Sequence, residues 1–428
     1  MNIQDIHNLF LQCKSVSIDT RKIETDSMFF AIKGENFDAN TFAAKALELG
    51  ALFVVIDNAS FAIDERTILV ENSLETLQEL AKFHRAYLKL PIIALTGSNG
   101  KTTTKELINV VISKKYKTKA TVGNLNNHIG VPLTLLSFSK ETEIGIVEMG
   151  ANHKKEIEFL CEIAQPDYGY ITNFGKAHLE GFGGVEGVIE GKSEMYQYLA
   201  KNDKVTFVNL EDPIQIEKSK GIKSFTFGVN NNAADINIKD IKANPFVAIQ
   251  YDNFNVESNL IGLYNANNIN AAVAIGHYFK VNEEDIKHAI ENYIPENNRS
   301  QLLRIDSNQI ILDAYNANPS SMAVAITNFL QLENLNKVMI LGDMFELGNE
   351  SHQEHKLIVE SLSDQDKSVC YLIGKYFYEN KVDKDNIKFF ETFDDFVAFI
   401  KTISFKENTI LIKGSRGMAL ERTLEYIK

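Results

Sequence analysis

The side chains best suited to chemistry lie in a glycine-rich segment, TGSNGKTTT, at residues 96–104. It follows the apolar run 92–96, a predicted strand, and precedes a stretch of helical period. In that setting the N–H groups of the turn can surround a phosphate, a lysine can neutralise its oxygens, and a threonine hydroxyl can hold Mg²⁺. The segment therefore predicts ATP or GTP binding. The candidate contacts are Gly97, Ser98, Asn99, Gly100, Lys101, Thr102 and Thr103.

One position departs from the full G-x-x-x-x-G-K-[ST] pattern, because Leu95 stands where that pattern has its first glycine. The loop is therefore a shortened variant. The alternative is a structural turn in which Lys101 is incidental, but the strand and helix predicted on either side favour a phosphate loop.

Two further side chains are expected at the same edge of the sheet. Glu148 lies near the end of the apolar run 144–149, and His178 follows the predicted strand 168–172. Ligands of open α/β sheets bind at the carboxyl ends of the strands, so a strand-end carboxylate can complete a Mg²⁺ site begun by Thr102. The alternatives are a solvated acid and a surface histidine.

Lys192 lies on the apolar stripe of a predicted helix, three residues from both Ile189 and Met195. This spacing places its stem against the core. Burial disfavours the charged form of a lysine and lowers its pKa, which leaves an amine able to add carbon dioxide. The alternative is a side chain whose ammonium group reaches water.

Polar residues further along the chain suit a nucleotide and a second ligand. Asn268 lies at the start of a predicted helix, Arg299 in a polar junction, and Asp313 at the end of a predicted strand. Amides and a strand-end acid can bind base and ribose, and an arginine can stabilise a transferring phosphate. The alternative is that these residues serve as a helix cap, a charge at the rim of the site or part of a turn. A second binding site is predicted from three polar loops that follow strands, 313–322, 341–348 and 413–417.

The elements that must position these residues can be read from the rest of the sequence. Apolar runs of strand length alternate with stretches of helical period, and this alternation predicts α/β domains around mostly parallel sheets. Domains are predicted at 1–85, 86–297 and 298–428, with a polar junction at 295–300. The segment 222–260 is expected to add antiparallel strands. The predicted helices include 43–49, 74–88, 266–279 and 283–293. The predicted strands are 27–32, 51–56, 92–96, 144–149, 168–172, 205–209, 224–228, 246–251, 254–260, 310–313, 338–341, 369–373, 387–389 and 409–413.

The composition is that of a globular protein with two or three domains: 428 residues, 44% hydrophobic and 24% charged. A net charge of −13 has the wrong sign for a broad contact with nucleic acid. Cys13, Cys161 and Cys370 form no C-x-x-C pair, so neither a zinc site nor a disulfide framework is expected, which fits the cytoplasm. Apolar runs are far shorter than the roughly 20 residues of a membrane span, and we expect neither a span nor an export signal.

Taken together, the motifs resemble the Mur ligase family over essentially the whole chain. The TGSNGKTTT loop is similar to the ATP loop of all Mur ligases and of the related folylpolyglutamate synthetases. More specific motifs resemble the branch that adds D-alanyl-D-alanine to a UDP-N-acetylmuramoyl tripeptide. These are GNLNNHIGVPLTLL at 123–136, VEMGA at 147–151, DAYNANPSSM at 313–322, LGDMFELG at 341–348 and KGSRG at 413–417.

The resemblance implies three domains: a small N-terminal α/β domain for the UDP-linked muramoyl peptide, a central P-loop ATPase-type parallel sheet, and a Rossmann-like C-terminal domain for the amino substrate. It implies nucleotide contacts at Asn268, Arg299 and Asp313 besides the ATP loop. It implies catalytic roles for Lys101, His178, Lys192 and Arg299. The implied Mg²⁺ positions are Thr102, Glu148, His178 and Lys192, and the lysine is carbamylated in relatives.

Substrate contacts are likewise carried over from the family. The N-terminal ones lie near Asp38-Ala39-Asn40, where the family usually has Asp-Gly-His. The implied substrate-binding residues are Thr20, Arg21, Gly34, Asp38, Asn124, Asn127, Tyr315, Asn316, Asn318, Ser321 and Arg416.

The implied reaction is ATP-dependent amide formation in peptidoglycan precursor synthesis, by a cytoplasmic enzyme that we expect to be a monomer. ATP would phosphorylate the tripeptide carboxylate, and the dipeptide amine would attack the acyl phosphate. Two alternatives remain: another amide ligase of the Mur or folylpolyglutamate synthetase type, and a P-loop module that switches partners without ligation. Phosphate release that depends on both peptide substrates would exclude the module.

Overall fold

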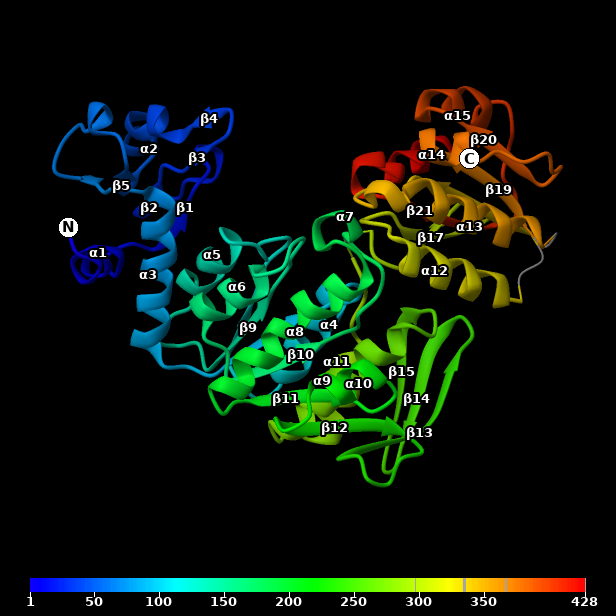
Figure 1. Cartoon of the computed structure of the whole chain (residues 1–428), viewed down its shortest axis with the longest axis horizontal. Helices are drawn as coiled ribbons and strands as arrows, with labels where there is room; N and C mark the ends of the chain where they lie inside the picture. Colours follow the sequence, from blue (N-terminus) through cyan, green and yellow to red (C-terminus); the bar gives the residue numbers. More distant parts are fainter. Residues whose placement is uncertain (297, 334–335, 366–367, 428) are drawn as a thin grey trace.

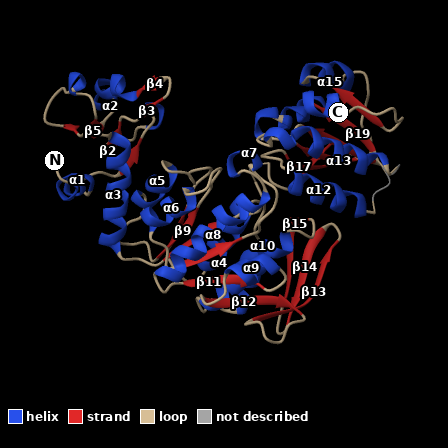
Figure 2. Cartoon of the chain, viewed as in Figure 1, coloured by secondary structure: helices blue, strands red, loops and turns tan. Residues whose placement is uncertain are grey.

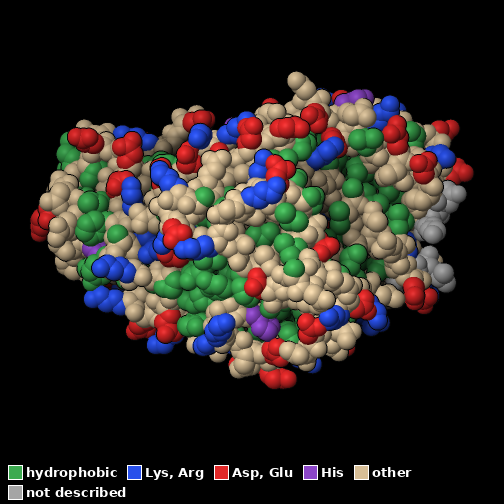
Figure 3. Space-filling model, turned by 60° about the horizontal axis from the view of Figure 1, so that its bottom comes forward, with side chains coloured by type: hydrophobic (Ala, Val, Ile, Leu, Met, Phe, Trp, Pro, Cys, Tyr) green, Lys and Arg blue, Asp and Glu red, His purple; other side chains and the backbone are tan. Residues whose placement is uncertain are grey.

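The computed structural model contains three large sheets, each with its own helices, and a separate two-stranded hairpin. It describes residues 1–296, 298–333, 336–365 and 368–427. Residue 297, inside the predicted junction 295–300, lies outside the described residues. The N-terminal and C-terminal lobes lie at opposite ends of a larger central lobe (Figure 1). Among the described helices, none is both long and apolar enough to cross a bilayer. Acidic and basic side chains are intermixed over the face seen in Figure 3.

The N-terminal lobe is built on a small parallel sheet with the strand order β1-β2-β5-β6. Its two inner strands, β2 (Ser27–Phe30) and β5 (Ala51–Ile56), confirm the predicted runs, although β2 ends two residues early. The outer strands carry no sequence signal, because three residues are too few for a period-two pattern. The remaining elements are β1 (Ser15–Ser17), β3 (Lys33–Gly34), β4 (Phe37–Asp38), β6 (Thr67–Leu69), α1 (Ile3–Phe10), α2 (Ala43–Glu48), α3 (Ser73–Leu88) and short 3₁₀ turns at Thr20–Lys22, Ala39–Phe42 and Ala59–Phe61.

The central lobe has a nine-stranded sheet with the order β15-β14-β13-β12-β11-β10-β7-β9-β8 and helices on both faces (Figure 2). Side chains alternate along its strands: Ile92 packs in one core cluster and Ile93 in the other, which is why the buried strands read as continuous apolar runs. One cluster includes α5, α6 and α8, and the other α4, α10 and α11. The helices are α4 (Lys101–Ile112), α5 (Gly130–Leu136), α6 (Glu156–Ala164), α7 (Leu179–Phe182), α8 (Val185–Lys201), α9 (Pro213–Lys218), α10 (Asn265–Tyr278) and α11 (Glu283–Glu291).

The antiparallel addition is smaller than predicted. The prediction for 222–260 is wrong for β12, which pairs in parallel with β11 because it returns through a crossover that contains α9. The only antiparallel pairs in this sheet, among the described residues, are β13–β14 and β14–β15. β13 was not predicted: the alternation of apolar and polar residues in INIKDIKA is interrupted at Lys239-Asp240, where the pairing with β14 shifts register. The strands are β7 (Ile92–Thr96), β8 (Thr118–Ala120), β9 (Ile144–Glu148), β10 (Tyr168–Ile171), β11 (Val205–Asn209), β12 (Lys223–Val229), β13 (Ile236–Ala243), β14 (Phe246–Tyr251) and β15 (Asn255–Ile261).

The C-terminal lobe is a second open α/β sheet, with the order β16-β17-β21-β18-β19-β20 and only β16 antiparallel. The five strands predicted in this part of the chain are confirmed as β17 to β21. Three of them end at the polar loops, so the loops share one edge of the sheet, as expected. The elements are β16 (Gln301–Ile305), β17 (Asn308–Asp313), β18 (Lys337–Gly342), β19 (Val369–Ile373), β20 (Ile387–Phe390), β21 (Thr409–Lys413), α12 (Pro319–Gln331), α13 (Ser351–Ser363), α14 (Lys375–Glu379), α15 (Phe393–Ile400) and 3₁₀ turns at Gly348–Glu350, Arg416–Met418 and Leu420–Tyr426.

Helix α3 joins the N-terminal lobe to the central one through a buried arginine. Arg85 donates from Nε to the carbonyl of Ala164 at 3.1 Å and from its terminal nitrogen to the carbonyl of Gln165, also at 3.1 Å. The same terminal nitrogen lies 2.8 Å from Oδ2 of Asp167. A guanidinium that satisfies two carbonyls and a carboxylate fixes the end of α3 on the central sheet.

Replacing Arg85 by Met should lower the free energy of unfolding by about 2–4 kcal/mol, because the mutation leaves buried acceptors unpaired. Urea unfolding followed by circular dichroism measures the change. Arg66→Met is the matched control, since the pair of Arg66 with Asp64 is partly exposed and such pairs contribute about 0–1 kcal/mol. An effect of Arg85→Met no larger than that of the control would contradict the proposed anchor.

Candidate active site

The loop between β7 and α4 has a conformation that only glycine adopts easily at two positions. Gly97 has φ +140° and Gly100 has φ +78°. A Cβ on Gly97 would lie 2.0 Å from Oγ1 of Thr172 and 2.9 Å from its backbone nitrogen, and a Cβ on Gly100 would lie 2.5 Å from Oδ1 of Asn268. The loop is therefore held against its neighbours more closely than any side chain would allow.

Helix α4 begins at Lys101 directly after this loop, and no side chain caps it. Its first N–H groups are thus available to an anion beside the positive end of the helix dipole. Nζ of Lys101 folds back to donate to the carbonyls of Gly97, at 2.7 Å, and Ser98, at 3.3 Å. Burial lowers the pKa of Lys101, Glu148 opposes that shift, and Arg299 adds to it.

A cavity of about 810 Å³ opens beside the loop and is lined by both the central and the C-terminal lobes. The predicted second site is therefore not separate: the C-terminal loops face the same space as the ATP loop. Gly97 is not part of the lining and lies beneath it, against β10. The predicted residues in the lining are Ser98, Asn99, Gly100, Lys101, Thr102, Thr103, Asn124, Asn127, Glu148, His178, Asn268, Arg299, Asp313, Tyr315, Asn316, Asn318, Ser321 and Arg416.

Glu148 and Thr102 have the features of a Mg²⁺ site. Glu148 ends β9 with its side chain almost wholly buried, and its Oε1 accepts from the amide of Asn126 at 2.8 Å. Its Oε2 is buried without a hydrogen-bond partner among the described residues. A buried carboxylate oxygen with free lone pairs fits a hard cation. In the described parts of the chain, no three His, Cys, Asp or Glu side chains cluster to hold a metal.

His178 lies in the lining at a left-handed backbone position, φ +52°. Its Nδ1 is paired with the Glu346 carboxylate, which comes from the LGDMFELG loop of the C-terminal lobe. This contact lowers the pKa of Glu346. Glu346 was not singled out in the sequence, because the partner that gives it a role is remote along the chain.

Lys192 is buried on α8, as its place on the apolar stripe predicted, and is only 1% exposed. It lies outside the residues that line the cavity. Nζ donates to the carbonyl of Ala151 at 3.1 Å and lies 5.0 Å from the ring centre of Phe182. Burial lowers the pKa of Lys192 well below its usual value, and the charge of Lys101 lowers it further.

Asp313 and its neighbours form the wall at the hinge between the central and C-terminal lobes. Its Oδ2 pairs with Nζ of Lys413 at 2.6 Å, and its Oδ1 accepts from the N–H of Ser300 at 3.1 Å. Ser300 in turn shares a hydrogen bond of 2.6 Å with the Tyr264 hydroxyl. Asn268 accepts from the hydroxyl of Thr104 on α4 at 3.0 Å. Asn268 and Asp313, the residues expected to bind the nucleoside, therefore lie in the first turn of α10 and at the end of β17.

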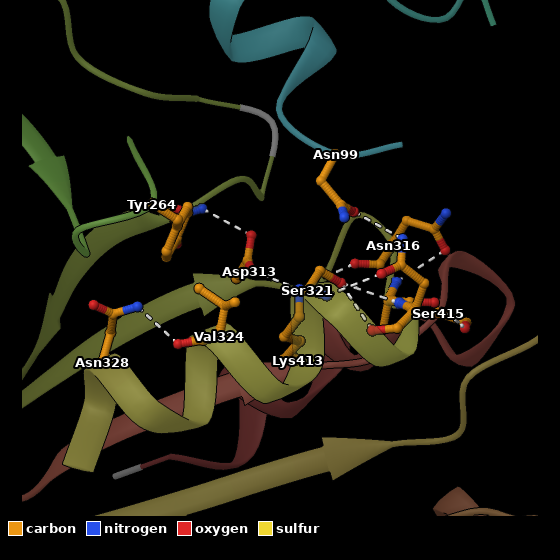
Figure 4. Close-up of polar contacts among 12 residues, drawn as sticks. Asn99, Tyr264, Asp313, Asn316, Ser321, Val324, Asn328, Lys413 and Ser415 are labelled. Atoms are coloured by element: carbon orange, nitrogen blue, oxygen red, sulfur yellow. Dashed lines mark hydrogen bonds and ion pairs between the residues drawn. The ribbon is translucent and has the colours of Figure 1, made fainter. Parts of the chain in front are cut away.

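The C-terminal lobe contacts the ATP loop directly (Figure 4). The amide of Asn318 donates to Oδ1 of Asn99 at 2.7 Å, and the side chain of Asn318 also caps α12 by accepting from the N–H of Ser321. The Ser415 hydroxyl donates to the carbonyl of Ala317 at 3.3 Å, which ties two of the polar loops together. These contacts place the predicted amino-substrate residues within reach of the phosphate loop.

The N-terminal candidates are not brought into this cavity. Arg21 pairs with Asp19 at 2.7 Å, and Thr20 begins the same 3₁₀ turn. Gly34 and Asp38 lie on the β3–β4 hairpin. Asn40, which stands where the family usually has histidine, is fully buried and donates to both Asp38 and Asp57. This lobe therefore offers a contact surface away from the phosphate loop.

A phosphate loop that shares one cavity with a second α/β lobe is typical of an enzyme that uses a nucleotide to act on a further substrate. Three family models match the chain: "Mur ligase family, catalytic domain" at 12–85, "Mur ligase middle domain" at 95–276 and "Mur ligase, glutamate ligase domain" at 298–416. The chain belongs to the Mur ligase family, whose members are ATP-dependent ligases that form C–N bonds.

Individual relatives agree with this assignment. The UDP-N-acetylmuramoyl-tripeptide–D-alanyl-D-alanine ligase of Bacillus subtilis is 35% identical over 96% of this chain and 92% of its own length. A crystal structure of MurF from Acinetobacter baumannii superimposes with a TM-score of 0.87, at 30% identity, and covers 99% of this chain and 98% of its own. The MurF ligase of Thermotoga maritima in complex with ADP has a TM-score of 0.83, at 26% identity and 97% coverage of both chains. The architecture is the three-domain one of these enzymes.

Replacing Gly97 by Ala should weaken ATP binding at least tenfold, because the new methyl group would overlap Thr172 and displace the loop. Isothermal titration with ATP and Mg²⁺ measures the change. Gly221→Ala is the matched control, since Gly221 also has a positive φ, +81°, but open space where the methyl group would lie. Wild-type affinity in Gly97→Ala would show that the loop does not hold the nucleotide.

Proposed function

We propose that this chain joins D-alanyl-D-alanine to a UDP-N-acetylmuramoyl tripeptide, with ATP as the phosphoryl donor, in peptidoglycan precursor synthesis. The observation that carries the proposal is the single cavity in which the ATP loop meets the loops DAYNANPSSM, LGDMFELG and KGSRG. The 35% identity to a curated ligase of this specificity, over nearly the whole chain, supports it.

The proposed reaction has two steps. The terminal carboxylate of the tripeptide attacks the γ-phosphate of ATP, which forms an acyl phosphate and ADP. The dipeptide amine then adds to the acyl carbon, and the tetrahedral intermediate expels phosphate. Phosphoryl transfer needs positioning and neutralisation of charge rather than covalent help from the protein, and Lys101 and Arg299 lie where they can supply both. The C-terminal lobe, which forms one wall of the cavity, would limit access of water to the acyl phosphate.

Bound Mg²⁺ would neutralise charge on the phosphate oxygens, and Thr102 and Glu148 are the residues that we assign to it. We propose that His178 contributes to the same site and that Lys192 carries a carbamate. The low pKa of Lys192 supports that modification, because only a neutral amine adds carbon dioxide. Carbamylation would give the buried side chain of Lys192 a negative charge in place of a positive one, near the charge of Lys101.

The remaining assignments follow the same proposal. The ATP loop, Asn268 and Asp313 would bind the nucleotide; Asn124 and Asn127 would contact the tripeptide; and the loops that contain Tyr315, Asn316, Asn318 and Ser321 would bind the dipeptide. The N-terminal hairpin and the turn at Thr20 and Arg21 would bind the UDP end. We place the domain boundaries at 1–85, 86–297 and 298–428. A monomer in the cytoplasm is the form that we propose, and the three free thiols fit a reducing compartment.

The purified protein should release phosphate only when ATP, the UDP-tripeptide and D-alanyl-D-alanine are all present. L-alanyl-L-alanine should give no more than background, because fixed polar groups are left unpaired by the wrong stereoisomer. A coupled phosphate assay measures both rates. Equal rates with the two dipeptides, or release without either peptide substrate, would refute the proposed function.

Lys192→Ala should be nearly inactive and partly rescued by acetate, which can enter the vacated space as an anion. Lys192→Arg should stay inactive, because arginine cannot be carbamylated. Carbon-13 NMR with labelled bicarbonate should show a carbamate signal in the wild type that both variants lack. Lys201→Ala, at the exposed end of the same helix, is the control and should keep signal and activity. A fully active Lys192→Arg enzyme would contradict the carbamate.

A further inference from the structure

His355, on α13, is a fully buried histidine whose two ring nitrogens both contact backbone groups. Its Nδ1 lies 2.6 Å from the carbonyl oxygen of Ser351, one turn earlier on the same helix. Its Nε2 lies 2.9 Å from the backbone nitrogen of Met344. The ring packs edge-on against the ring of Phe377, with 4.8 Å between the ring centres. These contacts hold the imidazole in one orientation.

The two backbone partners determine where the ring proton lies. A carbonyl oxygen can only accept a hydrogen bond, and a backbone nitrogen can only donate one. Nδ1 must therefore carry the proton and donate to Ser351, while Nε2 keeps a lone pair and accepts from Met344. Burial lowers the pKa of His355, which favours this neutral form, although the Ser351 carbonyl and the Asp343 carboxylate oppose the shift.

Met344 belongs to the LGDMFELG loop, and its neighbours in that loop are bound by other elements. The Asp343 carboxylate accepts from two N–H groups in the first turn of α14, both at 3.0 Å. The N–H of Phe345 donates at 2.9 Å to the hydroxyl of Ser415, which follows β21. Three consecutive residues are thus attached to three different parts of the C-terminal lobe, and His355 binds the middle one.

The next residue, Glu346, contacts the central lobe. Its carboxylate pairs with Nδ1 of His178, and its carbonyl accepts from the N–H of Glu180 at 3.4 Å. Its backbone is left-handed, φ +62°, a conformation that a residue with a side chain keeps only when its surroundings hold it. Both Glu346 and His178 line the cavity. A displacement of the loop at Met344 would therefore move a side chain in the cavity wall.

We propose that His355, as a neutral ring with its proton on Nδ1, is a positioning residue: it binds the N–H of Met344 and thereby places Glu346 against His178 at the junction of the two lobes. His355 is not among the residues that line the cavity, so it acts through the loop. This inference rests on the proposed function for its kinetic test, whereas its spectroscopic test needs no substrate.

Nitrogen-15 NMR of protein labelled at the histidine rings tests the tautomer in the wild type, and the signals missing from His355→Gln identify this residue. Near neutral pH we expect a proton on Nδ1 and none on Nε2, because the Met344 N–H occupies the Nε2 lone pair. A proton on Nε2, or on both nitrogens, would overturn the inference whatever the activity of any variant.

Two amide variants separate the two ring nitrogens, because the side-chain amide of Asn reaches only the place of Nδ1 and that of Gln reaches the place of Nε2. His355→Asn should lower kcat for phosphate release about ten- to a hundredfold, since a small displacement of cavity groups is enough for such a loss. His355→Gln should stay within about fivefold of the wild type, because its oxygen can accept from the Met344 N–H.

His352→Asn is the matched control, since His352 is exposed on the same helix and is hydrogen-bonded to Asn380. It should keep the wild-type kcat. A merely structural role would affect His355→Asn and His355→Gln alike, so equal kcat values in these two variants would overturn the inference.

A double mutant tests the route through Glu346. In a Glu346→Ala background, His355→Asn should lower kcat by no more than about twofold further, since the contact that it supports is already lost. A further loss as large as the one in the wild-type background would overturn the inference. A wild type that releases no phosphate with these substrates would refute the proposed function, and the NMR measurement would still decide whether His355 binds Met344 as a neutral ring.

Discussion

The structure depends on one segment, residues 172–180, which is hydrogen-bonded to the ATP loop on one side and to the C-terminal lobe on the other. Ser98 donates from its N–H to the carbonyl of Asn173 at 3.0 Å and from its hydroxyl to the carbonyl of Gly175 at 2.6 Å. Lys176 donates from its N–H to the Ser320 hydroxyl at 2.7 Å. The same short segment therefore supports both the phosphate loop and the C-terminal loops.

The second feature of the site is a group of basic side chains at and near the cavity, where four basic and four acidic residues lie in the lining. Lys101, Arg299 and Arg416 line one cavity, and Lys192 is buried nearby, although the net charge of the chain is −13. Burial makes a lysine costly to keep charged, and this is the main reason why the pKa values of Lys101 and Lys192 are lowered, although Glu148 opposes the shift of Lys101, and Glu156 and Glu194 that of Lys192. Phosphates and carboxylates can relieve this cost, which makes the free site electrostatically prepared for anionic ligands.

The two outer lobes contribute in different ways. The C-terminal lobe takes part in the cavity through side chains such as Asn318 and Glu346, which contact the central lobe directly. The N-terminal lobe is attached through α3 and the buried Arg85, and its candidate residues stay outside the cavity. A long substrate that spans from one lobe to the other would account for both arrangements, since its nucleotide end and its reacting carboxylate lie far apart.

Local pattern in the sequence determined the phosphate loop, the acid at the end of β9, the buried lysine on α8 and the strands of both large sheets, because these depend on residue type and short-range period. It missed the three-residue strand β8, and also β13 and β16, whose mixed polar and apolar residues form strands by pairing with neighbours. The pairing of His178 with Glu346, the tie between Asn99 and Asn318, and the meeting of Arg299 and Arg416 over Tyr315 were decided by the tertiary structure alone. Each of these contacts joins residues that are remote along the chain. The first two form because the C-terminal lobe packs against the central lobe, and the third because separate loops of the C-terminal part meet.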